Sequence, residues 1–134
     1  MTGDAHAFDF WLGEWEVFDA EGGHVGRNSV TAPYDTGALA EHWRGDSGVE
    51  GRSLNSWDPE RGCWHQTWID SSGGMLLLDG GLRDGAMVLT GVTADAQHRI
   101  TWTNDGDGVR QLWETSTDDG VTWSVAFDGR YSRA

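Results

Sequence analysis

Lysine is absent from this chain of 134 residues, and its nine basic side chains, all arginine, stand against 22 aspartates and glutamates. Without lysine, the chain can form no Schiff-base lysine, no P-loop lysine and no lysine general base. The formal net charge of −13 argues against nucleic acid and anionic membranes as partners, because both are bound by clustered cations. We therefore expect neither kind of partner.

Cysteine, long apolar runs and targeting signals are also scarce. The single Cys63 cannot form an internal disulfide, which fits a reducing compartment. Residues 1–6 contain neither the basic nor the apolar region of a secretory signal, and apolar runs such as Met75 to Leu78 are far too short to span a bilayer. These features predict a cytoplasmic protein. The length favours one domain over residues 1–134, with residues 1–7 flexible.

Turn signals are abundant instead. Clusters of glycine with Asp, Asn or Ser recur about every ten residues, and apolar and polar residues alternate between them, which is typical of an all-β sandwich or barrel. We expect about ten antiparallel strands in a single up-and-down β-barrel, because closure removes exposed edges. The strands are expected near residues 14–20, 24–32, 38–46, 51–57, 63–70, 75–81, 86–93, 99–103, 109–116 and 121–128.

Hairpin loops predict which side chains face the interior of the barrel. A four-residue loop at 59–62 pairs Trp57 with Trp64. Short loops at 47–48, 72–73 and 118–120 extend the pairing to further strands. The predicted interior then holds Trp57, Trp64, Trp68, Trp113, Trp123, Met75 and Leu77, together with His42, Arg44, Asn55, Gln66 and Asp79.

This mixture of side chains bears on function. A purely structural core avoids His, Asn, Gln and Asp, because each costs roughly 1–3 kcal/mol when buried unpaired. Aromatic walls with a few polar groups are typical of a small-molecule site. The alternative is a solid tryptophan core with the polar residues facing solvent, because a slip of one residue inverts both faces of a strand.

The start of the first expected strand carries a family resemblance. Gly13-Glu14-Trp15 resembles the G-x-W motif of the calycins, the lipocalin and fatty-acid-binding barrels. The resemblance implies that Trp15 plugs the closed end and that Arg130, from the last strand, lies across it through a cation–π contact. The whole chain also resembles a family of uncharacterised small bacterial calycin-like proteins. That resemblance rests on residues 8–15, 41–45, 51–55, 64–68 and 110–114, and it implies a calycin-like barrel without a particular chemistry.

A more distant similarity is to the nitrobindins, which are haem-binding bacterial barrels. Nitrobindins continue the motif into G-x-G and ligate haem through a histidine near the C-terminus. Here Glu16 and Val17 follow Trp15, and no histidine lies beyond His98. We therefore expect no haem and no other cofactor.

Metal and catalytic motifs are missing as well. The five histidines do not form a zinc-binding spacing, and the Asp-Gly-Asp-Gly stretch at 105–108 lacks the rest of a calcium loop. Residues 116–123 match a single Asp-box of β-propellers, which we interpret as a hairpin turn, because a propeller needs several blades. No metal site is predicted.

Two functions of a cavity remain open, beside a third hypothesis, a structural or interaction protein with tryptophans on its outer face. The first is a barrel that binds a small hydrophobic or aromatic molecule, with ligand-binding residues His42, Asn55, Trp57, Trp64, Gln66, Trp68, Trp113 and Trp123. The alternative is a cofactor-independent isomerase or cyclase in the same cavity. There His42 would act as general acid or base, Asp79 would orient it and Arg44 would stabilise an enolate. The sequence leaves the oligomeric state open.

Overall fold

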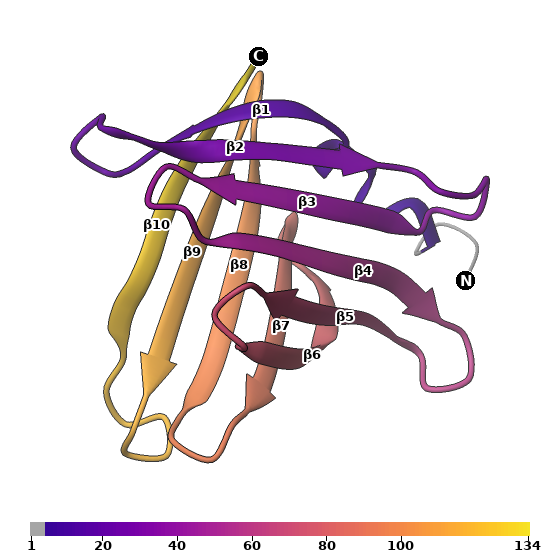
Figure 1. Cartoon of the computed structure of the whole chain (residues 1–134). Coiled ribbons are helices and arrows are strands. Elements are labelled where there is room, and N and C mark those ends of the chain that lie inside the picture. The colour runs from indigo at the N-terminus through magenta and orange to yellow at the C-terminus, as the bar shows by residue number, and fades with distance from the viewer. Residues whose placement is uncertain (1–4) are drawn as a thin grey trace.

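Ten antiparallel strands close into one barrel in the computed structural model, which describes residues 5–134 (Figure 1). A 3-10 turn, η2 (Asp9–Trp11), precedes them. The strands are β1 (Gly13–Phe18), β2 (His24–Thr31), β3 (Leu39–Gly45), β4 (Glu50–Asp58), β5 (Cys63–Asp70), β6 (Met75–Arg83), β7 (Ala86–Val92), β8 (Gln97–Asp105), β9 (Gly108–Ser116) and β10 (Ser124–Arg133). Each strand pairs with its neighbours in sequence, and β10 pairs with β1. The prediction of an all-β, up-and-down barrel of ten antiparallel strands is confirmed, and this architecture is consistent with a calycin-like barrel.

The expectation of flexibility over residues 1–7 falls partly on residues 1–4, which lie outside the described residues. His6 is described, and its Nδ1 lies 2.9 Å from a carboxylate oxygen of Asp9. Within residues 5–134, no helix combines the length and the apolar character needed to cross a membrane.

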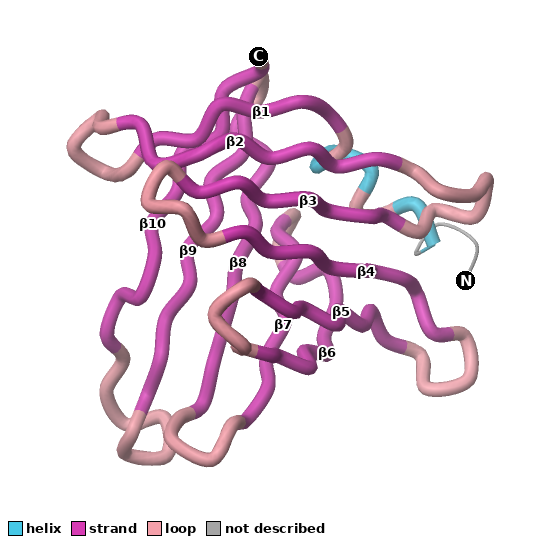
Figure 2. Tube along the Cα trace, in the orientation of Figure 1, coloured by secondary structure: helices cyan, strands magenta, loops and turns pink. Residues whose placement is uncertain are grey.

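The up-and-down topology gives the barrel two distinct ends (Figure 2). The loops after β1, β3, β5, β7 and β9 lie at one end, which we call the open end. The loops after β2, β4, β6 and β8 lie at the other end, together with η2. We call this the closed end.

The β4–β5 hairpin has the predicted register. Trp57 pairs with Trp64 across the two strands, and Asn55 pairs with Gln66. The four-residue loop between the strands is held by the carboxylate of Asp58, which accepts hydrogen bonds from the backbone N–H groups of Glu60 and Arg61. This local hydrogen bonding is why the sequence alone fixes the pairing here.

The β3–β4 and β5–β6 hairpins differ from prediction by one residue. Gly45 N donates to Val49 O at 2.8 Å and Asp70 N donates to Gly74 O at 3.0 Å, so each loop has three residues rather than two. The last loop residue is a glycine in the left-handed region, with φ of 99° at Gly48 and 91° at Gly73.

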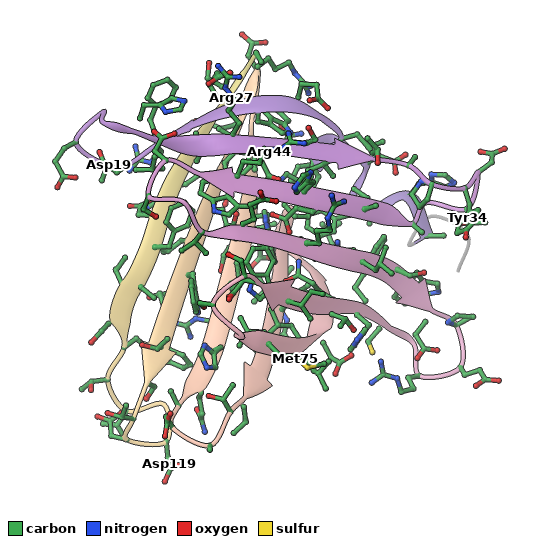
Figure 3. The ribbon with its side chains drawn as sticks, viewed as in Figure 1. Asp19, Arg27, Tyr34, Arg44, Met75 and Asp119 are labelled. Atoms are coloured by element: carbon green, nitrogen blue, oxygen red, sulfur yellow. The ribbon has the colours of Figure 1, made fainter. Side chains whose placement is uncertain are left out.

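The extra loop residue exchanges the two faces of the adjoining strand. On β3, Glu41 and Trp43 face inward, in place of His42 and Arg44. On β6, Leu76 and Leu78 face inward, whereas Met75, Leu77 and Asp79 face outward. Figure 3 shows Arg44 and Met75 on the outside of the barrel.

The β9–β10 hairpin also departs from prediction. Gly120 N donates to Ser116 Oγ and Thr122 N donates to Asp118 Oδ1, both at 2.8 Å, and these bonds hold a loop over residues 117–123. The predicted three-residue loop is therefore wrong. Trp123 belongs to this loop and stacks on the Arg99 guanidinium, 4.1 Å from the ring centroid, rather than facing inward.

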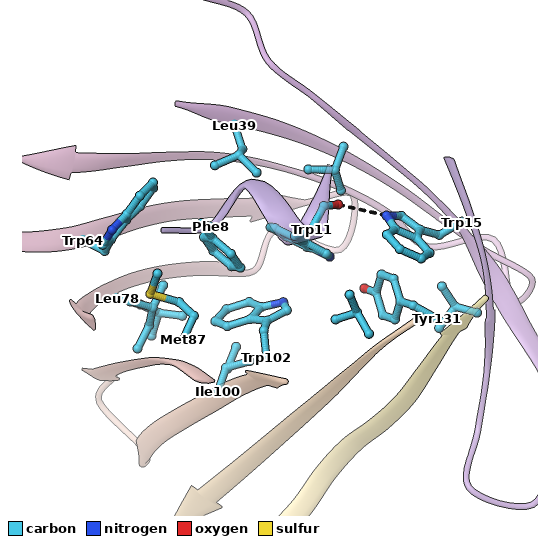
Figure 4. Close-up of a cluster of buried hydrophobic side chains, with 14 of the residues drawn as sticks. Phe8, Trp11, Trp15, Leu39, Trp64, Leu78, Met87, Ile100, Trp102 and Tyr131 are labelled. Carbon is cyan, nitrogen blue, oxygen red and sulfur yellow. Dashed lines mark hydrogen bonds between the residues drawn. The ribbon is translucent and has the colours of Figure 1, made fainter. Parts of the chain in front are cut away.

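Aromatic side chains fill the closed end (Figure 4). Phe8 stacks on Trp11 at 4.9 Å between ring centroids and packs against Trp64 and Trp102 at 5.6 and 5.2 Å. All four side chains are at most 1% exposed. We call Phe8, Trp11, Trp64 and Trp102 the aromatic plug.

Trp15 is buried beside the aromatic plug, and its indole N–H donates to Trp11 O at 2.9 Å. The arginine across its ring is Arg133, 4.3 Å from the centroid, and not Arg130. Arg130 pairs with Asp128 on the outer face, because it follows the inward-facing Gly129 and precedes the buried Tyr131 on β10.

Candidate functional site

A cavity of about 250 Å³ occupies the half of the barrel nearer the open end. Four aromatic rings form much of its wall, and polar side chains lie deeper, toward the middle of the barrel. The lining residues are Glu41, Trp43, Val49, Gln66, Trp68, Asp70, Leu76, Ile100, Gln111, Trp113, Ala126, Phe127 and Tyr131.

Glycines let the aromatic rings lie against the barrel wall. A Cβ atom on Gly51 would lie 1.9 Å from Cη2 of Trp68, and one on Gly26 would lie 2.5 Å from Cη2 of Trp43. Each ring therefore covers a glycine on a neighbouring strand. The rings lie along the wall instead of crossing the lumen, which leaves the centre of the barrel open.

The remaining aromatic walls are also held in place. Phe127 packs against Trp43 with a centroid distance of 5.9 Å and an interplanar angle of 72°. On the neighbouring strand β9, Trp113 pairs with Phe127, and its indole N–H donates to Nδ1 of His98 at 3.1 Å. Desolvation lowers the pKa of His98, which favours the neutral ring that this hydrogen bond requires.

Polar side chains from six strands form the base of the cavity. We call Asn28, Glu41, Ser53, Asn55, Gln66, Gln111 and Tyr131 the polar floor. On one side, Gln66 donates to Asn55 at 2.7 Å, Asn55 to Ser53 at 2.9 Å, and Ser53 to Glu41 at 2.7 Å. On the other side, Asn28 donates to both Glu41 and Tyr131, at 2.8 and 2.9 Å, and Tyr131 donates to Gln111 at 2.6 Å.

Glu41 lies where the two chains of hydrogen bonds meet. It is 6% exposed, and no basic side chain of residues 5–134 forms an ion pair with it. Burial raises the pKa of Glu41 to about 7, although the hydrogen bonds from Ser53 and Asn28 favour the ionised form. The protein therefore holds a carboxyl group that changes charge near neutral pH against an aromatic cavity.

Three of the predicted ligand-binding residues line the cavity: Gln66, Trp68 and Trp113. Asn55 lies one hydrogen bond behind Gln66 in the polar floor. The tryptophan pair predicted at the β4–β5 hairpin is inside the barrel, but it belongs to the closed end: Trp64 is part of the aromatic plug, and Trp57 packs against it.

The other predicted site residues lie outside the cavity. His42 faces outward on β3, where Nε2 lies 3.0 Å from a carboxylate oxygen of Glu50. Arg44 is exposed on the same face, and Asp79 pairs with Arg61 and His65 on the outer surface. Trp123 stacks on Arg99 in the last loop. The predictions for His42, Arg44 and Asp79 are wrong because the β3–β4 and β5–β6 registers differ from the expected ones by one residue. The prediction for Trp123 is wrong because the β9–β10 loop is longer than expected.

The sequence analysis missed Glu41, Trp43 and Tyr131 as cavity residues, and it did not name Gln111 and Phe127 as ligand-binding residues. The inward position of Glu41 and Trp43 follows from the length of the loop at 45–49, which the structure shows. Residues 19–23 and 70–74 share the pattern of an aspartate followed by two residues and a glycine, and both adopt three-residue loops. Applying the same loop length at 45–49, where glycine also closes the loop, turns Glu41 and Trp43 inward.

Neither a metal site among the described residues nor a similar known protein helps to assign a function to the cavity. Among residues 5–134, no three His, Cys, Asp or Glu side chains converge as a metal site. No protein-family model matches the chain, and no curated protein matches it significantly.

Proposed function

We propose that this barrel binds a small, largely apolar molecule with one or two rings in the cavity. The observation that carries the proposal is the arrangement of Trp43 and Trp68 over glycines. A solid structural core would direct these indoles into the lumen, whereas here they line an open space. Aromatic walls with a few polar groups at the base are typical of ligand sites.

The dimensions and charge of the cavity narrow the ligand. Its volume of about 250 Å³ lies below the range of roughly 300–1,000 Å³ that holds drug-sized molecules, which favours a compact ligand. Gln66, Gln111 and Glu41 offer hydrogen bonds at one end of it. None of the described lining residues is basic, so a carboxylate or phosphate ligand would meet no opposite charge. No cofactor is part of this proposal.

Native mass spectrometry of the purified protein, followed by tryptophan-fluorescence titration against a library of one- and two-ring compounds, tests the proposal. We expect saturable binding that is weakened by Trp68→Ala and Trp113→Ala. Trp123→Ala is the matched control, because this indole lies outside the cavity. Binding that is equally affected by all three substitutions, or no binding by any compound, would refute a ligand site in the barrel.

A second candidate function, proton transfer on the bound molecule, is supported by Glu41. The isomerase hypothesis required an acid–base group in the cavity, and His42 does not lie there. Glu41 does, and burial brings its pKa to about 7, which suits a general acid or base at neutral pH. Incubation of a bound compound in D₂O tests this function: carbon-bound deuterium should appear with the wild-type protein and not with Glu41→Gln.

A further inference from the structure

We propose that the cavity selects an organic cation, namely a primary amine on a small aromatic or alkyl ring system, whose ammonium group pairs with the carboxylate of Glu41. This inference rests on the proposed ligand-binding function and names the chemical class of the ligand. It is carried by the charges that line the cavity, the hydrogen bonds of the polar floor and the aromatic walls.

The charged groups of the cavity are all acidic. Glu41 lies at its base and Asp70 lines it near the β5–β6 loop, where Asp70 accepts a hydrogen bond from the indole of Trp68 at 3.1 Å. No described residue of the lining is basic. A cation entering from solvent therefore passes one carboxylate and reaches a second, whereas an anion is repelled by both.

The polar floor supplies donors to Glu41 and leaves its charge uncompensated. Ser53 and Asn28 each donate to one carboxylate oxygen, and both are neutral. Taking a carboxylate out of water is costly unless an opposite charge pairs with it. An ammonium group is a compact cation with several N–H donors, and it can occupy the free lone pairs of the carboxylate that face the cavity.

The aromatic walls favour the same class of ligand. Trp43 and Phe127 meet nearly at a right angle at 5.9 Å, and Trp68 and Trp113 complete the wall. The faces of such rings attract cations, and tryptophan does so most strongly. At longer range, the net charge of −13 raises the local concentration of cations around the protein.

Three probes of nearly equal size test the inference: 2-phenylethylamine, 2-phenylethanol and phenylacetate, each titrated by calorimetry. We expect the amine to bind about tenfold more tightly than the alcohol, and phenylacetate to bind most weakly. Glu41→Gln should reduce the affinity for the amine about tenfold and the affinity for the alcohol by much less, so that the preference for the amine is lost. Glu50→Gln is the matched control, because this carboxylate lies on the outer face beside His42.

The pH dependence in the unmodified protein provides an independent readout. Ionisation of Glu41 should raise the affinity for the amine about tenfold as the pH rises from about 6 to about 8, with proton release on binding near pH 7. The other titratable groups around the cavity each favour one charge state in this range. Tyr131 stays protonated because its pKa is raised, Asp70 stays ionised because its pKa is lowered by Ser72, and desolvation lowers the pKa of His98, which favours its neutral form.

The outcomes separate this inference from the proposed function. If the alcohol and the amine bind equally well at all pH values, or if phenylacetate binds best, the preference for a cationic ligand is refuted. The proposed ligand site itself is then still supported. If none of the probes binds and the compound library also gives no ligand, both are refuted. Should Glu41→Gln fail to fold, the ranking of the probes and the pH profile of the wild-type protein still decide the matter.

Discussion

At the scale of single residues, Glu41 shows how position on a strand determines chemistry. Its neighbour His42 faces outward, where Nε2 lies 3.0 Å from a carboxylate oxygen of Glu50. Glu41, one residue earlier, faces the lumen and loses its hydration. The free energy of unfolding must reflect that loss, because the ordinary pKa of the carboxyl returns when the chain unfolds.

We predict that Glu41→Gln removes a pH-dependent loss of stability. The pKa is about 7 in the folded state and 4.5 in the unfolded state, so the folded protein binds the additional proton between these values. Stability contributed by this group is therefore present below about pH 4.5 and is lost as the pH rises through about 7. The loss is ~3 kcal/mol when complete, from the size of the shift.

Urea unfolding of the wild-type and variant proteins at about pH 5 and pH 8 measures this effect. The variant should gain stability relative to wild type between the two pH values. Glu50→Gln is again the control, because His42 lowers the pKa of Glu50 and no such gain is expected. An equal response of the two variants would contradict the electrostatic role of Glu41.

At the scale of strands and hairpins, the sequence predicts which segments form strands better than it predicts the register in which the strands pair. All ten expected strands are present, although β10 begins at Ser124 and runs to Arg133 instead of spanning residues 121–128. The β4–β5 pairing is correct, since alternation and the Asp58 loop are local signals. The β3–β4 register depends partly on a contact from outside the hairpin: Asp46 N in the loop donates to Val25 O of β2 at 2.9 Å. A glycine at the end of a loop is compatible with loops of two or three residues, and contacts of this kind lie beyond what a local pattern can specify.

The glycines under the aromatic rings allow a prediction at the same scale. Gly51→Ala places a methyl group 1.9 Å from Trp68 Cη2, so the ring must move toward the lumen. We expect weaker ligand binding, a shifted tryptophan emission and a loss of about 1–3 kcal/mol in stability. Gly81→Ala on β6 is the matched control, because a Cβ there meets nothing within 4 Å. If the two variants bind ligand alike, the glycine does not position the Trp68 ring.

At the scale of the whole molecule, seven of the nine tryptophans divide between two tasks. Trp11, Trp15, Trp64 and Trp102 are buried toward the closed end, whereas Trp43, Trp68 and Trp113 line the cavity. The composition showed that aromatic residues are abundant, but it did not show this division. The division depends on which half of each strand carries the indole, and that follows only once the barrel is closed and its registers are known.

This division predicts that stability and binding respond to different tryptophans. Trp11→Ala removes a fully buried ring from the aromatic plug and should cost about 3–5 kcal/mol in unfolding free energy, while the affinity of the folded protein for its ligand changes little. Trp113→Ala should have the opposite profile, with a clear loss of affinity and a smaller loss of stability, because this ring is partly exposed to the cavity. Tyr34→Ala, at a side chain that is 71% exposed, should alter neither quantity. Chemical denaturation and ligand titration on the three variants measure both responses, and parallel losses in Trp11→Ala and Trp113→Ala would show that plug and cavity are one cooperative core.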